Sequence, residues 1–327
     1  MDPFARLTVL GSLNMDISVT VPTLPAPGAT VLGGGATFAP GGKGANQAVA
    51  AARLGAESGI RVRMVGCVGD DDFGRTLKAS LSREGVDDSA VRTVPGAPTG
   101  IAMITVDQAG ENIITVAPGA NREVNQQDIG AIGETAGDLP SVLVISAEVP
   151  VPAIRAALAN ADTAASRALT VVNLAPAPPL EEAAAILTQR PDWLVVNESE
   201  AAAVLGRPVS GLQEAARAAT DLVKAGAGNA VVTAGAAGAA YQAAQEPSSR
   251  TVPAFAVHAR DTVGAGDTFV GALAVSLVAG IGPAEAVTAA SAAAATAATR
   301  PGTQAGMPRP ADISAATGYA WPVPVAG

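Results

Sequence analysis

The sequence predicts an α/β fold: a doubly wound, mostly parallel sheet with helices on both faces, and a small β-sheet lid beside it. Two observations predict the main sheet. Short runs rich in Val, Ile and Leu alternate with Ala-rich stretches of helical length, as expected when crossover helices join parallel strands. Each run is apolar nearly throughout, which is typical of strands covered on both faces.

The strand candidates of this sheet are six apolar runs, namely Leu7 to Leu10, Val62 to Val68, Val142 to Ser146, Leu169 to Asn173, Trp193 to Asn197 and Ala230 to Thr233. Among the helices, Phe269 to Ile281 is broken by Gly and Ser and is too short for a membrane span, so we expect a buried core helix. Thr and Ser residues interrupt the Ala-rich tract from Ala286 to Thr299, which favours an ordinary helix over low complexity.

Four further segments predict a second, smaller sheet. They are Ile17 to Val21, Ala29 to Phe38, Ile101 to Val106 and Asn112 to Val116, and DQAGE with its hairpin chemistry joins the last two. Such a sheet exposes one face unless it covers a ligand or pairs with another copy of the chain. We therefore interpret it as a lid and a dimer contact; the alternative is a plain surface hairpin.

Composition excludes several function classes. The chain has 327 residues, a net charge of −9 and 49% hydrophobic residues, so it folds and lacks the basic excess that nucleic acid binding requires. One Cys, Cys67, and one His, His258, supply neither a disulfide nor a Cys/His zinc site. No signal peptide or membrane span is visible, and we expect a cytoplasmic protein that binds no membrane.

The segment DTVGAGDTFVGALAVSLVAG begins at Asp261 and predicts an anion-binding helix N-terminus. Gly264, Ala265 and Gly266 precede Asp267 and a long apolar helix, so several backbone amides converge where the helix dipole is positive. A carboxylate beside a bound phosphate favours a general base, although a plain helix cap remains an alternative for Asp267.

A second glycine-rich segment, GGKGANQ, runs from Gly41 to Gln47. Gly42 lets the backbone approach a ligand, and Lys43 and Asn46 offer donors about one helical turn apart. It is not a P-loop, because Gly44 stands where Ser or Thr would meet magnesium, and no dinucleotide fingerprint follows the first strand. A glycine-rich turn without a ligand remains the alternative.

Polar residues also follow several predicted strands, where open α/β sheets bind ligands. Asn14 and Asp16 follow the first strand and Glu148 follows the run at Val142, and with Lys43 and Asn46 they suit the hydroxyls of a sugar. Their alternative is that each serves only as a turn or cap residue.

Two further strand ends suit a nucleotide. Asn197 and Glu200 open a helix, where they order magnesium-bound water around a triphosphate or simply cap the helix. The small-residue turn Thr233, Ala234, Gly235, Ala236, Ala237 and Gly238 suits an adenine or a ribose, or is an ordinary loop.

In this order the segments resemble the ribokinase branch of the PfkB carbohydrate kinase family over about residues 7 to 312. The specific signatures are GGKGANQAVAAARLGA and DTVGAGDTFVGAL, and GSLNMD, PTG, NESE and TRPGTQ also match. The resemblance implies one kinase domain over residues 1–327, with lid strands from about 17–40 and 98–118 inserted. It implies transfer of the γ-phosphoryl group of ATP to the 5-hydroxyl of D-ribose, with Mg²⁺ and K⁺ as cofactors and a homodimer joined through the lid strands.

The resemblance also implies residue roles. Asp267 is the base and the amides of Gly264, Ala265 and Gly266 stabilise the transferring phosphoryl group. The sugar-binding set is Asn14, Asp16, Gly42, Lys43, Asn46, Glu148 and Asp267, and the nucleotide set is Asn197, Glu200, residues Thr233 to Gly238, Gly266 and Ser291.

A monovalent cation site is implied as well, formed by Asp261, Val263, Ala297, Arg300, Gly302 and Gly306. Gly306 stands where relatives often carry Ser, and Ser291 stands where some present a larger side chain. The tail from Gly318 onward has no match. Deoxyribose, a ketohexose or a nucleoside remains an alternative acceptor; a non-catalytic sugar-binding relative is a further alternative, but it would not need Asp267 and its glycines.

Overall fold

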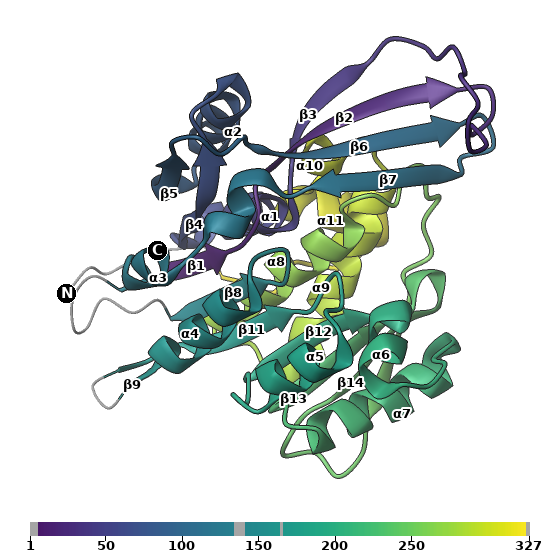
Figure 1. Cartoon of the computed structure of the whole chain (residues 1–327). Coiled ribbons are helices and arrows are strands. Elements are labelled where there is room, and N and C mark those ends of the chain that lie inside the picture. Colours follow the sequence, from purple (N-terminus) through teal and green to yellow (C-terminus); the bar gives the residue numbers. More distant parts are fainter. Residues whose placement is uncertain (1–5, 134–140, 164–165, 325–327) are drawn as a thin grey trace.

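The computed structural model describes residues 6–133, 141–163 and 166–324 of the chain (Figure 1). Its main sheet has the strand order β15-β14-β13-β12-β11-β8-β1-β4-β5. The strands are β1 (Arg6–Leu10), β4 (Arg61–Gly69), β5 (Asp87–Val94), β8 (Val142–Ser146), β11 (Leu169–Asn173), β12 (Trp193–Asn197), β13 (Asn229–Thr233), β14 (Gly238–Gln242) and β15 (Arg250–Pro253). All neighbours pair in parallel except β13 with β14 and β14 with β15, which confirms the mostly parallel sheet.

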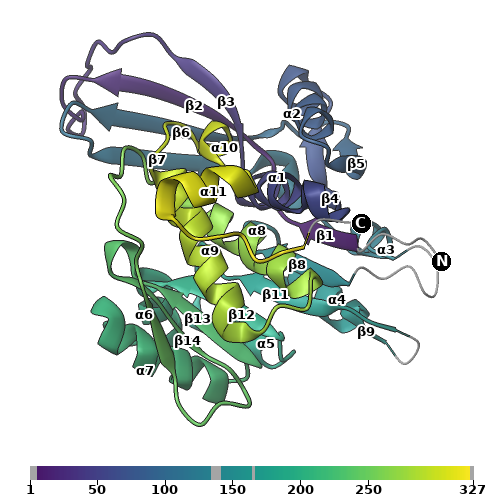
Figure 2. The same ribbon diagram turned by 180° about the vertical axis from the view of Figure 1, so that it is seen from behind.

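Helices cover both faces of this sheet, as Figures 1 and 2 show from opposite sides. One face carries α1 (Lys43–Gly55), α2 (Asp72–Arg83), α8 (Ala265–Val278), α9 (Pro283–Ala298), α10 (Thr303–Gly306) and α11 (Pro310–Thr317). The other carries α3 (Gln126–Gly130), α4 (Val151–Ala161), α5 (Leu180–Leu187), α6 (Glu198–Leu205) and α7 (Gly211–Lys224). Short 3₁₀ turns are η1 (Ala56–Ser58), η2 (Gly119–Glu123) and η3 (Gly235–Ala237), and β9 (Asp162–Thr163) pairs with β10 (Ser166–Arg167).

Alternate residues of each central strand face opposite cores. In β8, Val142 and Val144 pack with α1, α8 and α9, whereas Leu143 and Ile145 pack with the helices of the other face. Both sets are fully buried, which explains why the strand reads as one unbroken apolar run. No described helix has the length and the apolar character that spanning a bilayer requires.

A separate four-stranded sheet extends from one side of the body (Figure 1). Its strands, in the order β3-β2-β6-β7, are β3 (Thr37–Gly41), β2 (Asn14–Val21), β6 (Gly100–Asp107) and β7 (Asn112–Ala117). We call it the lid sheet. The DQAGE turn joins β6 to β7 as expected, with Gly110 N donating to Asp107 O at 3.1 Å.

Several expected boundaries were wrong. The strand expected over 29–38 begins only at Thr37, because the Pro- and Gly-rich stretch before it forms no ladder. The strands β5, β14 and β15 were not expected at all, since none of them is a continuous apolar run. The tail after Gly318 packs on the core, where Val323 is buried and the Tyr319 ring lies 5.7 Å from that of Phe255.

Candidate active site

A pocket opens at the carboxyl ends of the central strands, where open α/β sheets bind ligands. Its empty volume is about 490 Å³. The residues lining it are Lys43, Asn173, Ala175, Val195, Val196, Asn197, Glu200, Thr233, Gly264, Gly266 and Asp267. It therefore combines residues from both glycine-rich segments, which lie more than 200 positions apart in the sequence, with three strand ends.

Asp267 lies in the first turn of α8, and its carboxylate is held by two amide groups. Asn46 Nδ2 donates to Oδ2 at 2.9 Å and Gln47 Nε2 donates to Oδ1 at 3.1 Å. Among the described residues no side chain, that of Asp267 included, caps this helix, so the capping alternative for Asp267 is wrong. Burial raises the pKa of the Asp267 carboxyl, and Lys43, Asn46 and Gln47 lower it by less.

The open N-terminus of α8 supplies amide donors at the pocket. Gly264 is the N-cap residue, directly before the helix, and has a φ of 80°, a left-handed conformation that favours glycine. Gly264 and Gly266 line the pocket. The amide of Ala265 instead donates to Thr262 O at 3.2 Å, so two of the three expected amides are available to a ligand.

Lys43 carries the positive charge of the site. Its ammonium lies 3.8 Å from Glu148 Oε1, and its side chain is one-third exposed. Burial lowers the pKa of Lys43, but the surrounding carboxylates, with Asp267 and Glu148 foremost, raise it by more. The ammonium therefore stays charged, as binding of a phosphate requires.

The sugar-binding residues expected from the sequence lie at the base of the lid sheet. Asn14 and Asp16 belong to β2, and a Cβ at Gly41, the register partner of Asn14, would lie 2.2 Å from Asp16 Oδ2. Gly42 has a φ of 89°, and a Cβ there would lie 2.6 Å from Asn14 N, so this close approach requires glycine. Glu148 Oε2 accepts from Ser12 Oγ at 2.5 Å and from Lys43 N at 3.3 Å.

The carboxyl of Asp16 has a pKa far above its ordinary value. This pKa is raised to about 7, chiefly by burial and also by the carboxylates of Glu148 and Asp267, whereas Lys43 lowers it. Its ordinary value is 3.8, so the folded chain retains a proton that the unfolded chain releases between about pH 4 and 7. Asp16 consequently destabilises the folded state increasingly as the pH rises through this range.

Asp16→Asn is expected to remove this dependence. The midpoint of thermal unfolding, measured from pH 5 to 8, should fall less in the variant than in the unsubstituted chain. Asp70→Asn, which changes an exposed carboxylate, is the matched control. Parallel curves for the unsubstituted chain and Asp16→Asn would contradict the raised pKa.

The residues expected to bind the nucleotide are only partly brought together. Asn197 and Glu200 form a capping box at the start of α6, with reciprocal hydrogen bonds of 2.8 Å, and both line the pocket with Thr233. Ala234 to Gly238 form the expected turn, outside the residues lining the pocket. Ser291 is buried in α9, its Oγ donates to Val287 O at 2.9 Å, and it does not line the pocket.

The candidate cation residues gather where the loop before α8 meets the end of α9. The Asp261 carboxylate accepts from Val263 N at 3.0 Å and from Gly302 N at 2.8 Å. A Cβ at Gly306 would lie 3.2 Å from Arg300 O and 3.5 Å from Ala297 O, so these carbonyl oxygens point toward one place.

Comparisons with known proteins agree with this geometry. Residues 5–310 match the model of the pfkB family carbohydrate kinases. The chain belongs to the pfkB family. A ribokinase of Haemophilus influenzae is 36% identical over 92% of this chain and 95% of its own length, and a deoxyribokinase of Salmonella typhimurium is 34% identical over 82% and 84%. The structure of an Arabidopsis thaliana ribokinase complexed with ribose and ATP has a TM-score of 0.82 at 26% identity, covering 97% of this chain and 100% of that one.

The chain is thus a pfkB carbohydrate kinase, and its structure adds residues to which the sequence assigned no role. Gln47 Nε2 also donates to Asn173 Oδ1 at 2.9 Å, and Gln304 Nε2 donates to Asn46 Oδ1 at 3.0 Å. Because Gln304 donates to the oxygen of the Asn46 amide, the nitrogen of that amide is the end that faces Asp267. The sequence pointed to the segments that contain these residues. Gln47 and Gln304 are the last residues of the GGKGANQ and TRPGTQ motifs, and Asn173 is the last residue of a predicted strand.

Proposed function

We propose that this pfkB kinase transfers the γ-phosphoryl group of ATP to the 5-hydroxyl of D-ribose and releases ribose 5-phosphate and ADP. The observation that carries the proposal is the buried Asp267 carboxylate, held by two amide donors at an open helix N-terminus. Asp267 lines the pocket that suits a triphosphate and accepts a hydrogen bond from Asn46 of the expected sugar-binding set.

Asp267 accepts the proton of the 5-hydroxyl as the oxygen attacks the γ-phosphorus. The new P–O bond forms while the bond from the γ-phosphorus to the bridging β,γ-oxygen breaks, and ADP leaves with the electron pair. The raised pKa of Asp267 makes its carboxylate a stronger base than a solvated aspartate. The amides of Gly264 and Gly266, together with the Lys43 ammonium, stabilise the negative charge on the transferring group.

The sugar is held by donors and acceptors on both sides of Asp267. Asp16 and Glu148 accept from its hydroxyl groups, and Asn14, Lys43 and Asn46 donate to them, with the Gly42 backbone in close approach. Only 3% of the residues are aromatic, so the chain offers few rings to stack on a nucleobase, which favours a sugar over a nucleoside.

For the nucleotide, Thr233 and the turn from Ala234 to Gly238 would contact the adenosine, and Asn197 and Glu200 would face the phosphates. The described residues hold no cluster of three or more His, Cys, Asp or Glu side chains that could bind a metal ion. This fits Mg²⁺, which proteins usually bind through one or two carboxylates together with substrate phosphates and water. Bound there with ATP, Mg²⁺ neutralises phosphate charge, and Glu200 is the carboxylate of this chain placed to orient its water.

Oxygen ligands around Gly306 fit a K⁺ ion, since the carbonyls of Ala297 and Arg300 converge there and Asp261 supplies a nearby charge. A cation that binds only the folded state stabilises it, and the stabilisation grows with the logarithm of the ratio of cation concentration to Kd. We expect KCl to raise both the thermal unfolding midpoint and the activity above those in tetramethylammonium chloride at equal ionic strength. Asp261→Asn should abolish both differences. Equal midpoints in the two salts for the unsubstituted chain would contradict the site.

The lid sheet supports a homodimer. Ile113 and Ile114 of β7 are 48% and 50% exposed, and as adjacent strand residues they point to opposite faces of the sheet. Met103 and Phe38 are exposed on the same sheet. We expect light scattering to give twice the chain mass of 32.0 kDa, and Ile113→Glu with Ile114→Glu to give the single mass. Leu180→Glu, at an exposed position at the start of α5, should leave the dimer intact. A monomeric unsubstituted chain would refute the dimer.

The acceptor is tested by ADP release with magnesium-ATP and a panel of D-ribose, 2-deoxyribose, fructose and adenosine. D-ribose is expected to give the highest kcat/KM. 5-Deoxy-D-ribose is the matched control, because it keeps the ring hydroxyls but lacks the accepting one, and it should inhibit competitively without turnover. The deoxyribokinase relative makes 2-deoxyribose the second candidate, and a higher kcat/KM for that sugar would move the substrate and keep the mechanism. No turnover of any sugar would refute the proposal.

A further inference from the structure

Asn121 lies in η2, directly after the last strand of the lid sheet, and its side chain is fully engaged. The residue is 1% exposed. Its Oδ1 accepts from Leu13 N at 2.9 Å, and its Nδ2 donates to Leu13 O at 3.1 Å and to Asn14 Oδ1 at 2.8 Å. No step of the phosphoryl transfer uses this residue, although it contacts a residue of the sugar-binding set.

The Leu13 backbone fixes which way round the Asn121 amide lies. A backbone N–H only donates and a carbonyl only accepts, so Oδ1 must face Leu13 N and Nδ2 must face Leu13 O. The second hydrogen of Nδ2 then faces Asn14 and selects the oxygen of the Asn14 amide. Asn14 Nδ2 is consequently turned away from Asn121, and within the described chain it donates to no other residue.

The structure leaves room for this amide pair at one specific position. Gly100 is the register partner of Asn14 in the pairing of β2 with β6. A Cβ at Gly100 would lie 2.3 Å from Asn14 Oδ1 and 2.4 Å from Asn121 Nδ2. Any other residue would separate the two amides, so this glycine of the PTG motif is explained by the contact between Asn14 and Asn121.

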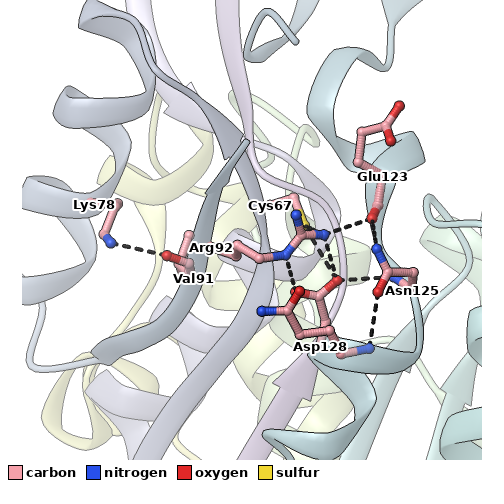
Figure 3. A network of polar contacts seen from close by, with 8 residues as sticks. Cys67, Lys78, Val91, Arg92, Glu123, Asn125 and Asp128 are labelled. Carbon is pink, nitrogen blue, oxygen red and sulfur yellow. Dashed lines mark hydrogen bonds and ion pairs between the residues drawn. The ribbon is translucent and has the colours of Figure 1, made fainter. Parts of the chain in front are cut away.

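The segment that carries Asn121 is pinned to the main sheet (Figure 3). Arg92 of β5 donates to Glu123 O at 2.7 Å and to both oxygens of Asp128 at 2.7 and 2.8 Å. Asp128 in turn accepts from Asn125 N at 2.9 Å. The Cys67 thiol beside this ion pair is no nucleophile, because burial raises its pKa to about 12. Asn121 therefore has a fixed backbone as well as a fixed amide.

We propose that Asn121 is a positioning residue that sets the polarity of the Asn14 amide, so that Asn14 presents an N–H donor to an oxygen of the sugar. The expected effect on turnover rests on the proposed function, whereas the orientation of the Asn14 amide by Asn121 does not. An unconstrained Asn14 would rotate and offer its oxygen to the sugar as readily as its nitrogen, and the fixed polarity selects an acceptor on the bound ligand.

A double-mutant cycle tests whether Asn121 acts through Asn14. Asn121→Ala is expected to raise the KM for the sugar about 5- to 10-fold, as loss of one oriented hydrogen bond does, with kcat and the KM for ATP nearly unchanged. In the Asn14→Ala background it should raise that KM no further. Equal effects in both backgrounds would overturn the proposal, because a merely structural role is additive. Gln127→Ala, which removes an exposed side-chain amide from α3, is the matched control and should leave the KM unchanged.

A second variant reverses the polarity and needs no turnover. In Asn121→Asp the new carboxylate has no hydrogen to donate, so the Asn14 amide should rotate and donate its own N–H to it. With ¹⁵N-asparagine labelling, and the Asn14 side-chain signal assigned by its loss in Asn14→Ala, that signal should shift and become protected from exchange with water. An unchanged signal in the folded variant would overturn the inference. A wild-type protein inactive on every sugar would refute the proposed function alone, because this spectrum still decides the role of Asn121.

Discussion

Asp267→Asn is expected to lower kcat by about 10²- to 10⁴-fold, the range usually lost with a general base. The asparagine keeps the shape of the side chain but cannot take the hydroxyl proton. Sugar affinity should change far less, because the sugar-binding residues at the base of the lid sheet remain. Single-turnover measurement of ADP formation at saturating sugar and ATP gives the chemical step directly.

The fold should survive this substitution. The substitution removes the charge of a carboxyl whose pKa is raised by burial, so it removes a buried charge that is costly to the fold. The asparagine also keeps one of the two side-chain oxygens that accept from Asn46 and Gln47. Asp72→Asn is the control, since this side chain on α2 is 96% exposed and does not line the pocket. An Asp267→Asn variant with more than a tenth of the original kcat would remove Asp267 as the base.

Gly266→Leu is expected to block the phosphate end of the pocket without disturbing the fold. Gly266 lines the pocket, and no heavy atom lies within 4 Å of a Cβ placed there. The leucine would extend into space that the phosphates need and cover the amide donors of the α8 N-terminus. We expect kcat/KM for ATP to fall about 10²- to 10³-fold, comparable with removing an oxyanion-hole donor.

Substitutions at two other glycines distinguish a blocked pocket from a destabilised fold. Gly282→Leu, at the start of α9, also has open space around its Cβ but lies outside the pocket, and it should keep full activity. Gly264→Ala should instead lower the thermal unfolding midpoint, because its φ is 80° and its Cβ would lie 2.8 Å from Thr303 Cγ2. An unchanged kcat/KM for ATP in Gly266→Leu would mean that the phosphates of ATP do not bind at the N-terminus of α8.

The sequence predicted most of the main sheet because the central strands are buried on both faces. Such burial demands unbroken Val, Ile and Leu, and β8, β11 and β12 begin and end at the expected residues. The strands that it missed lie toward the edges of the sheet. Arg250–Pro253 is largely exposed, so packing imposes no apolar pattern on it, and its pairing depends on β14.

The sequence by itself determined the fold class, the two glycine-rich segments and the side chains that bring the chemistry, because these depend on residue type and local spacing. Only the tertiary structure decided what those side chains do to one another. Asn46 and Gln47 meet Asp267 across some 220 positions, and Asn121 reaches Asn14 across 107. Burial, together with the carboxylates of Glu148 and Asp267, raises the pKa of Asp16 to about 7. Hydrogen-bond polarity and desolvation are set by which groups share a buried volume, and no local pattern in the sequence contains that information.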